Sequence, residues 1–84
     1  MKDKFNVTLK PGDFIAYAVR EGNSGEMKIG KVFDTEDNQA RVRGLRTWGA
    51  YSVGNIGTLF YSERIVKLHP DTVPEEIKEL YFNS

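Results

Sequence analysis

MKIGKVFDTEDNQARVRGL, residues 27–45, is the stretch of sequence that decides the fold. Two runs of strand-forming residues, 27–33 and 40–45, surround a stretch rich in turn-forming residues, 34–39. Two such runs joined by a turn predict a β-hairpin. This hairpin is the best-specified element in the chain.

The register of the hairpin follows from the burial of its valines. We expect Val32 to pair with Val42, because a sheet with one buried face fixes its register by placing apolar pairs on that face. The register then sets one further inner pair and one outer pair: Gly30 with Gly44, and Lys31 with Arg43. The outer face of the hairpin is therefore predicted to be basic.

Four further segments outside the hairpin have strand patterns. A Pro-Gly turn at 11–12 opens the apolar run 14–19, which suits a central strand. The runs 59–61 and 65–68 predict two more strands, with a tight turn between them. Residues 5–9 alternate between apolar and polar and predict an edge strand. Together these segments place the chain in the mainly β class.

The segment 44–57 interleaves four glycines with Trp48, Tyr51 and Ile56. This spacing is typical of a long loop or of a bent strand with bulges, because glycine adopts backbone angles that other residues rarely take. Both alternatives are open at this point.

The C-terminal segment, about 73–82, has the pattern of a helix. Thr72 and Glu75 fit a capping box, with Thr72 as the N-cap. Four apolar residues fall on one helical stripe: Val73, Ile77, Leu80 and Tyr81. We expect this stripe to cover an open end of the barrel; the alternative is a docking surface for a partner or a second copy.

The order of the strand patterns resembles an SH3-like small barrel of the kind found in KOW and Tudor-type modules. The resemblance spans roughly residues 10–68 and is carried by four motifs: Pro11-Gly12-Asp13, Gly30-Lys31-Val32, Ala40-Arg41-Val42-Arg43-Gly44 and Ile65-Val66-Lys67-Leu68. It implies a single domain over residues 1–84, with a barrel of about five strands at about 5–69 and a short C-terminal α-helix. It also implies a partner that is RNA, DNA or a protein of transcription, translation or chromatin machinery.

The composition narrows the class of protein. The 84 residues are 39% hydrophobic and 29% charged, which suits one small globular domain. The chain has no cysteine, so disulfides and thiolate metal sites are excluded. No apolar run approaches the ~20 residues of a membrane span, and the N-terminus lacks the apolar segment of a signal peptide. We therefore expect a cytoplasmic protein that does not contact membranes.

The first candidate site is the basic outer face of the hairpin. Its residues are Lys31, Arg41 and Arg43, extended by Arg46 and by Lys28. A repulsive pair such as Lys31 opposite Arg43 is understandable where phosphates bind. The alternative is a solvated face whose charge is balanced by acidic residues at the hairpin tip: Asp34, Glu36 and Asp37. The formal net charge of zero is consistent with that alternative.

The second candidate site is the aromatic pair Trp48 and Tyr51, which follows Arg46. Exposed aromatics beside an arginine can stack on bases or anchor a protein partner. Alternatively, Trp48 folds back over one end of the barrel, because a small core needs the area that it supplies.

No catalytic or cofactor signature accompanies these candidates. His69 is the only histidine, and no nucleophile with an orienting group lies near it in the sequence. We therefore predict a protein that is not an enzyme and needs no metal or small-molecule cofactor. The first hypothesis is a nucleic-acid-associated binding module that uses the basic hairpin face. The alternative is a protein-interaction module, an adaptor or inhibitor, that docks through the glycine-aromatic loop or the C-terminal helix.

Overall fold

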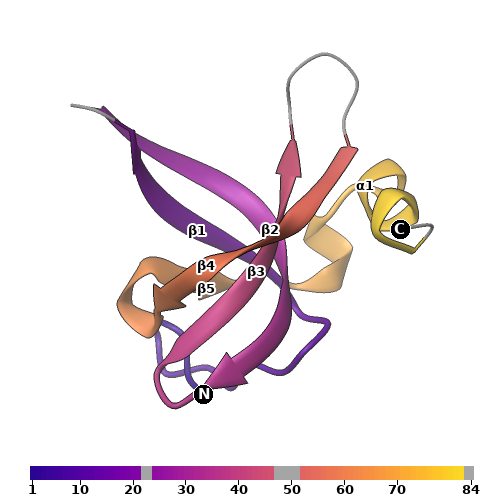
Figure 1. Ribbon diagram of the computed structural model, residues 1–84. Helices are drawn as coiled ribbons and strands as arrows, with labels where there is room; N and C mark the ends of the chain where they lie inside the picture. Colours follow the sequence, from indigo (N-terminus) through magenta and orange to yellow (C-terminus); the bar gives the residue numbers. More distant parts are fainter. Residues whose placement is uncertain (22–23, 47–51, 83–84) are drawn as a thin grey trace.

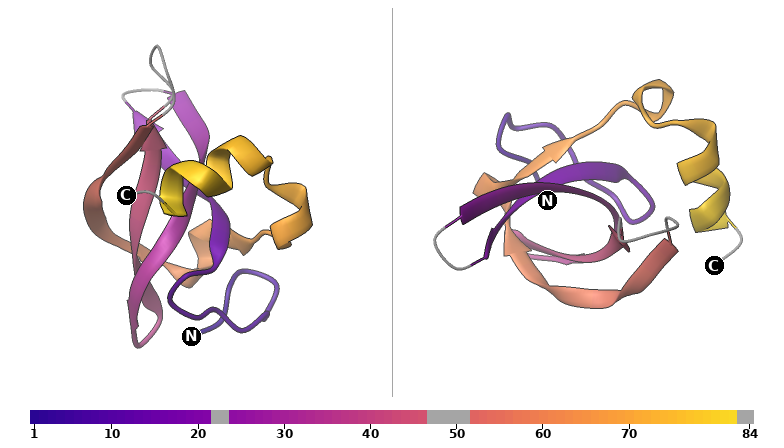
Figure 2. Two further views of the ribbon diagram at one scale, coloured as in Figure 1. Left: turned by 90° about the vertical axis from the view of Figure 1, so that its right-hand side faces the viewer. Right: turned by 90° about the horizontal axis from the view of Figure 1, so that it is seen from above.

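The computed structural model describes residues 1–21, 24–46 and 52–82. Five strands form one antiparallel sheet in the order β4-β3-β2-β1-β5. They are β1 (Phe14–Glu21), β2 (Ser24–Glu36), β3 (Gln39–Arg46), β4 (Ser52–Tyr61) and β5 (Ile65–Lys67). The sheet curls around itself, and the helix α1 (Glu75–Phe82) lies beside it (Figures 1 and 2). The predicted class, a small mainly β domain with a short C-terminal helix, is confirmed.

The predicted hairpin is formed by β2 and β3 in the expected register. Val32 pairs with Val42, and the predicted pairs at Gly30–Gly44 and Lys31–Arg43 are present. The strands extend further than their patterns indicated, so that only Asp37 and Asn38 form the turn. Asp37 adopts a left-handed φ of 50°, which an aspartate tolerates better than most residues.

A β-bulge interrupts the hairpin at Phe33. The register shifts between Val32 and Asp34, so that Asp34 and not Phe33 pairs with Arg41. Without the extra residue, Asp34 would face Ala40 and its carboxylate would point into the core. The bulge therefore keeps a charged side chain on the outer face, at the cost of one unpaired strand position.

The glycine-rich segment continues as β4, a bent strand with irregularities. Its register with β3 shifts between Arg41 and Arg43 and again between Arg43 and Leu45. At Gly57 a Cβ atom would lie 3.2 Å from the Val42 carbonyl oxygen, so the two backbones approach closely there. Of the two alternatives predicted for 44–57, the bent, irregular strand is confirmed at 52–57, and residues 47–51 lie outside the described part.

The main core lies inside the curled sheet, and a tyrosine crosses it. Ile15, Val32 and Val42 are almost fully buried, and the Tyr17 ring packs 5.0 Å from that of Phe60. A Cβ at Gly44 would lie 2.5 Å from the Tyr17 hydroxyl oxygen, and one at Gly30 would lie 2.9 Å from the Tyr17 ring. The two facing glycines therefore make the space in which Tyr17 lies.

The N-terminal segment forms a loop where an edge strand was expected over residues 5–9. Phe5 and Val7 are exposed, and only Leu9 of the alternating residues is buried. The buried carboxylate of Asp3 organises this loop. It accepts hydrogen bonds from the backbone N–H groups of Phe5 (2.8 Å), Val7 (2.9 Å) and Lys67 (2.8 Å). The third bond ties the loop to β5, so tertiary contacts replaced the strand that alternation predicted.

The C-terminal segment contains the predicted helix, with a different beginning. The Pro74 carbonyl accepts the N–H of Lys78 at 3.1 Å, so the helix begins here. Thr72 belongs instead to a preceding 3₁₀ turn, η2 (Pro70–Thr72), and the predicted capping box is wrong. Another 3₁₀ turn, η1 (Ser62–Arg64), joins β4 to β5 at the predicted tight turn. Within the described residues, no helix is long and apolar enough to cross a membrane.

The apolar stripe of the helix is buried as predicted, against a second hydrophobic cluster. Val73, Ile77 and Tyr81 pack with Leu45. Four partly buried residues complete the cluster: Leu80 of the helical stripe and, from the sheet and the linker, Phe14, Val53 and Leu68. Phe14 and Leu45 point away from the barrel core, because Ile15 and Gly44 next to them point inward. The helix therefore covers the outer face of the sheet, where we expected it to close an end.

Candidate binding surface on the outer face of the hairpin

The candidate surface is the outer face of β2, β3 and β4, which holds most of the predicted basic residues. One end of this face lies under α1, and the other end extends to the hairpin turn (Figure 1). The two ends differ in what their charged side chains contact.

Lys31 lies under the helix, between aromatic rings. Its ammonium nitrogen is 5.4 Å from the centroid of the Phe14 ring and 5.9 Å from that of Tyr81. These two rings meet edge to face, with centroids 5.4 Å apart. A cation over aromatic faces is stabilised by their quadrupoles. Lys31 is thus half-buried and has a structural role that the sequence did not indicate.

Arg43 stands opposite Lys31 as predicted and supports the helix through its backbone. Its carbonyl oxygen accepts a hydrogen bond of 2.7 Å from the Tyr81 hydroxyl. Burial raises the pKa of Tyr81, so this hydroxyl stays a donor throughout the neutral range. The Arg43 side chain is half-buried.

Arg41 is exposed and bound to a carboxylate. Its Nε donates to Oδ1 of Asp34 at 2.9 Å, and a second guanidinium nitrogen contacts Oδ2. The hydrogen bond from Arg41 lowers the pKa of Asp34, and Asp34 raises the pKa of Arg41. The guanidinium carbon also lies 5.7 Å from the centroid of the Phe33 ring. The charge of Arg41 is therefore balanced within the face.

Lys28 lies on the other side of the sheet from Lys31. The pairing of β1 with β2 is regular from Phe14–Lys31 to Glu21–Ser24, so Lys28 shares the inner side with Gly30 and Val32. Its pairing partner is Tyr17. Burial raises the pKa of Tyr17, and the Lys28 charge opposes that shift. Placing Lys28 on the basic outer face was wrong, and strand alternation alone predicts this inner position.

Two of the predicted site residues, Trp48 and Tyr51, lie outside the described residues. Arg46 ends β3, where it pairs with Ser52, and the position of its side chain also lies outside the description. Of the six predicted nucleic-acid contacts, the structure therefore brings three onto one face: Lys31, Arg41 and Arg43.

An apolar patch surrounds Arg41 toward the hairpin turn. Its three members are exposed: Phe33 (46%), Leu59 (37%) and Tyr61 (50%). Leu59 pairs directly with Arg41, and Tyr61 lies two residues further along the same side of β4. We call Phe33, Leu59 and Tyr61 the hairpin patch.

Two cross-strand rows define the outer face at the patch. The first row runs Asp34, Arg41 and Leu59 across β2, β3 and β4. The second row, two residues nearer the turn, runs Glu36, Gln39 and Tyr61. Because the intervening row points inward, these six side chains form one grid. Acidic residues occupy its β2 side and apolar residues its β4 side.

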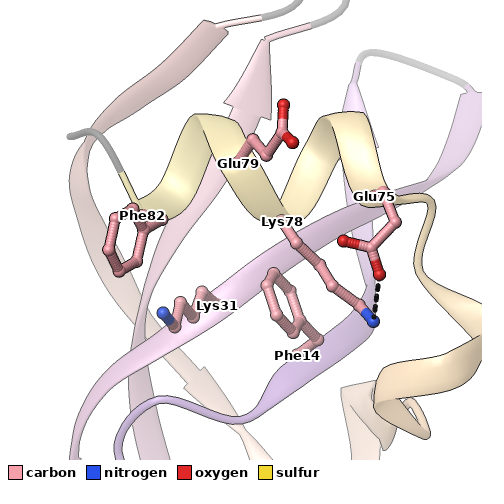
Figure 3. A pocket seen from close by; sticks show the side chains of 6 residues that line it. All are labelled: Phe14, Lys31, Glu75, Lys78, Glu79 and Phe82. Carbon is pink, nitrogen blue, oxygen red and sulfur yellow. Dashed lines mark hydrogen bonds and ion pairs between the residues drawn. The ribbon is translucent and has the colours of Figure 1, made fainter.

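A shallow groove runs between α1 and the sheet at the other end of the face (Figure 3). Its volume is about 350 Å³. The lining residues come from the helix and from β1 and β2: Phe14, Lys31, Glu75, Lys78, Glu79 and Phe82. Lys78 pairs with Glu75 at 3.4 Å, and Phe82 is 86% exposed. The groove is therefore aromatic on two sides with mixed charge between them.

His69 contacts its own turn. Its Nδ1 accepts the backbone N–H of Asp71 at 3.2 Å. In the part of the chain that the structure describes, no three His, Cys, Asp or Glu residues are grouped so that they can hold a metal ion.

Comparisons with known proteins returned no relative: no family model, curated protein or solved structure matches the chain. The resemblance to KOW and Tudor-type modules therefore stays a prediction.

Sequence reasoning missed the hairpin patch, whereas the ion pair of Arg41 with Asp34 agrees with the predicted alternative that acidic residues at the hairpin tip balance the basic face. The alternation Leu59-Phe60-Tyr61 was a signal, because Phe60 packs on the core and its neighbours must then point outward. The pairing of Arg41 with Asp34 depends on the bulge at Phe33. The sequence signal for that bulge was the pair of consecutive apolar residues Val32 and Phe33, which breaks the alternation of apolar and polar residues.

Proposed function

We propose that this protein is a non-enzymatic binding domain that docks on another protein through the hairpin patch. The observation that carries the proposal is the exposure of Phe33, Leu59 and Tyr61 around a charge-balanced arginine. Aromatic residues and arginine are enriched where proteins bind one another. When a partner binds, these three neighbouring side chains would lose water and form the centre of the interface, and the polar residues around them would form its border.

The charges of the hairpin face support a protein partner over a nucleic acid. Phosphate binding requires cations that point to solvent. Arg41 is bound to Asp34, and Lys31 is held over two rings beneath the helix. Of the three cations on this face, one is paired with a carboxylate and the other two, Lys31 and Arg43, are half-buried, which leaves less of their charge open to a phosphate backbone.

Site-specific photo-crosslinking in the cells that produce the protein tests this proposal. A photoreactive phenylalanine analogue at Tyr61 is expected to give a discrete cross-linked protein. The matched control is the same analogue at Met27, which is 64% exposed at the far end of β2 and should give none. Cross-linking from Met27 that equals that from Tyr61 would contradict the proposed surface.

An amide NMR titration with short RNA and DNA tests the nucleic-acid alternative. We expect no shifts at Lys31, Arg41 or Arg43. Shifts at these residues that fade from low to moderate salt would replace the protein partner with a nucleic acid.

A further inference from the structure

We infer that the segment bound at the hairpin patch is cationic, an extended stretch of protein that carries lysine or arginine two residues away from an apolar residue. The inference rests on the proposed function and adds the chemistry of the partner. It follows from where the carboxylates stand relative to the patch.

The carboxylates occupy one border of the grid. Asp34 and Glu36 share the β2 side, and the exposed Asp37 follows in the turn. Asp34 is paired with Arg41, and the negative charge of Glu36 also raises the pKa of Arg41. One arginine among three carboxylates leaves this border with an excess of negative charge.

The turn η1 brings a fourth carboxylate near the same border. The Ser62 N–H donates to the Asn38 carbonyl at 2.9 Å, which places the start of η1 against the hairpin turn. Glu63 and Arg64 follow there and are both exposed. Their charges offset one another, so the excess stays negative.

The spacing of the border and the patch matches an extended amphipathic segment. Glu36 and Tyr61 lie in one row, with Gln39 between them. Neighbouring strands lie about 4.8 Å apart, so the carboxylate and the ring are separated by roughly 10 Å. A lysine or arginine can thus reach Glu36 while an apolar side chain two residues along the segment, which points to the same side, contacts Leu59 or Tyr61. An acidic segment would meet like charge along the whole border.

Charge complementarity of this kind acts on specificity and on the association rate. Exposed charges are screened by salt, so the contribution of the border must fall as ionic strength rises. The apolar contribution of the patch responds little to salt. The two contributions can therefore be separated in one experiment.

The test is an NMR titration with three synthetic peptides of equal length. The first carries lysine and leucine two residues apart with serine between them, the second replaces each lysine with glutamate, and the third replaces it with serine. We expect the lysine peptide to shift the amides of Phe33, Leu59 and Tyr61. Its affinity should exceed that of the serine peptide by about tenfold at low salt and approach it at moderate salt.

Charge reversal provides the matched control. The double variant Glu36→Lys with Asp37→Asn should lose the tenfold preference for the lysine peptide, and asparagine tolerates the left-handed φ at position 37. Glu26→Lys with Glu76→Gln changes the net charge equally at exposed positions away from the patch and should keep the preference.

The outcomes separate this inference from the proposed function. Binding of the glutamate or serine peptide at the patch as tightly as the lysine peptide overturns the cationic partner and leaves a protein-binding patch. If none of the peptides shifts the amides of the patch, both are overturned.

Discussion

The buried carboxylate of Asp3 is expected to be a main determinant of stability, because its hydrogen bonds join the N-terminal loop to β5. It accepts two N–H groups of its own loop through Oδ1 and the Lys67 N–H of β5 through Oδ2. Asp3 is 6% exposed. Water therefore cannot readily replace these bonds, and a substitution that removes a carboxylate oxygen leaves a buried N–H group without its acceptor.

The variant Asp3→Asn removes one acceptor and leaves the shape of the side chain intact. If its remaining oxygen still accepts from Phe5 and Val7, its NH₂ group must face the Lys67 N–H, donor against donor. A hydrogen bond to a charged group contributes about 1.5–3 kcal/mol, and an unsatisfied buried donor costs about 1–3 kcal/mol. We therefore expect Asp3→Asn to lower the free energy of unfolding by about 2–4 kcal/mol, measured by urea denaturation.

The pH dependence of this loss has a definite sign. Burial alone would raise the pKa of Asp3, but the three backbone N–H groups and the Lys67 charge outweigh it, so the pKa is lowered. A lowered folded pKa contributes stability above the unfolded value near ~3.9 and loses it as pH falls through the folded pKa. The gap between wild type and Asp3→Asn should be full at neutral pH and shrink in acid.

Two measurements complete the test of Asp3. Amide hydrogen exchange at Lys67 should accelerate in Asp3→Asn, since that amide loses its acceptor. The control Asp37→Asn makes the same substitution at the exposed hairpin turn and should leave stability nearly unchanged. A loss below about 0.5 kcal/mol for Asp3→Asn, or a gap that does not narrow in acid, would refute the reasoning.

Two further substitutions test the packing that positions the outer face. Gly44→Ala should destabilise the domain by about 1–3 kcal/mol in urea denaturation, because its methyl group would meet the Tyr17 hydroxyl. Combining it with Tyr17→Phe should recover part of the loss, and full additivity would contradict this contact. Tyr81→Phe should cost about 0.5–1.5 kcal/mol, because the Arg43 carbonyl loses its donor. A thermal unfolding midpoint unchanged from wild type would show that this bond contributes nothing.

The hairpin shows which structural features the local sequence pattern can predict. Placing Val32 opposite Val42 fixed Lys31 opposite Arg43, because strand alternation has a period of two and burial selects one face. The helical stripe from Val73 to Tyr81 followed from its own periodicity. These features depend on neighbours in the chain, so the sequence alone was sufficient for them.

The environment of each charged side chain on the basic face could be determined only from the tertiary structure. Pairing of Arg41 with Asp34 depends on the bulge at Phe33, and Lys31 is covered because the helix, distant in sequence, packs on Phe14. The anchoring of the N-terminal loop by Asp3 likewise spans 64 residues to Lys67. The sequence determined the strands that follow residue 13, the hairpin register and the buried faces, whereas the strand predicted over residues 5–9 is a loop. Only long-range packing decided which charges are neutralised and which apolar side chains remain exposed, since both depend on contacts between segments that local periodicity does not encode.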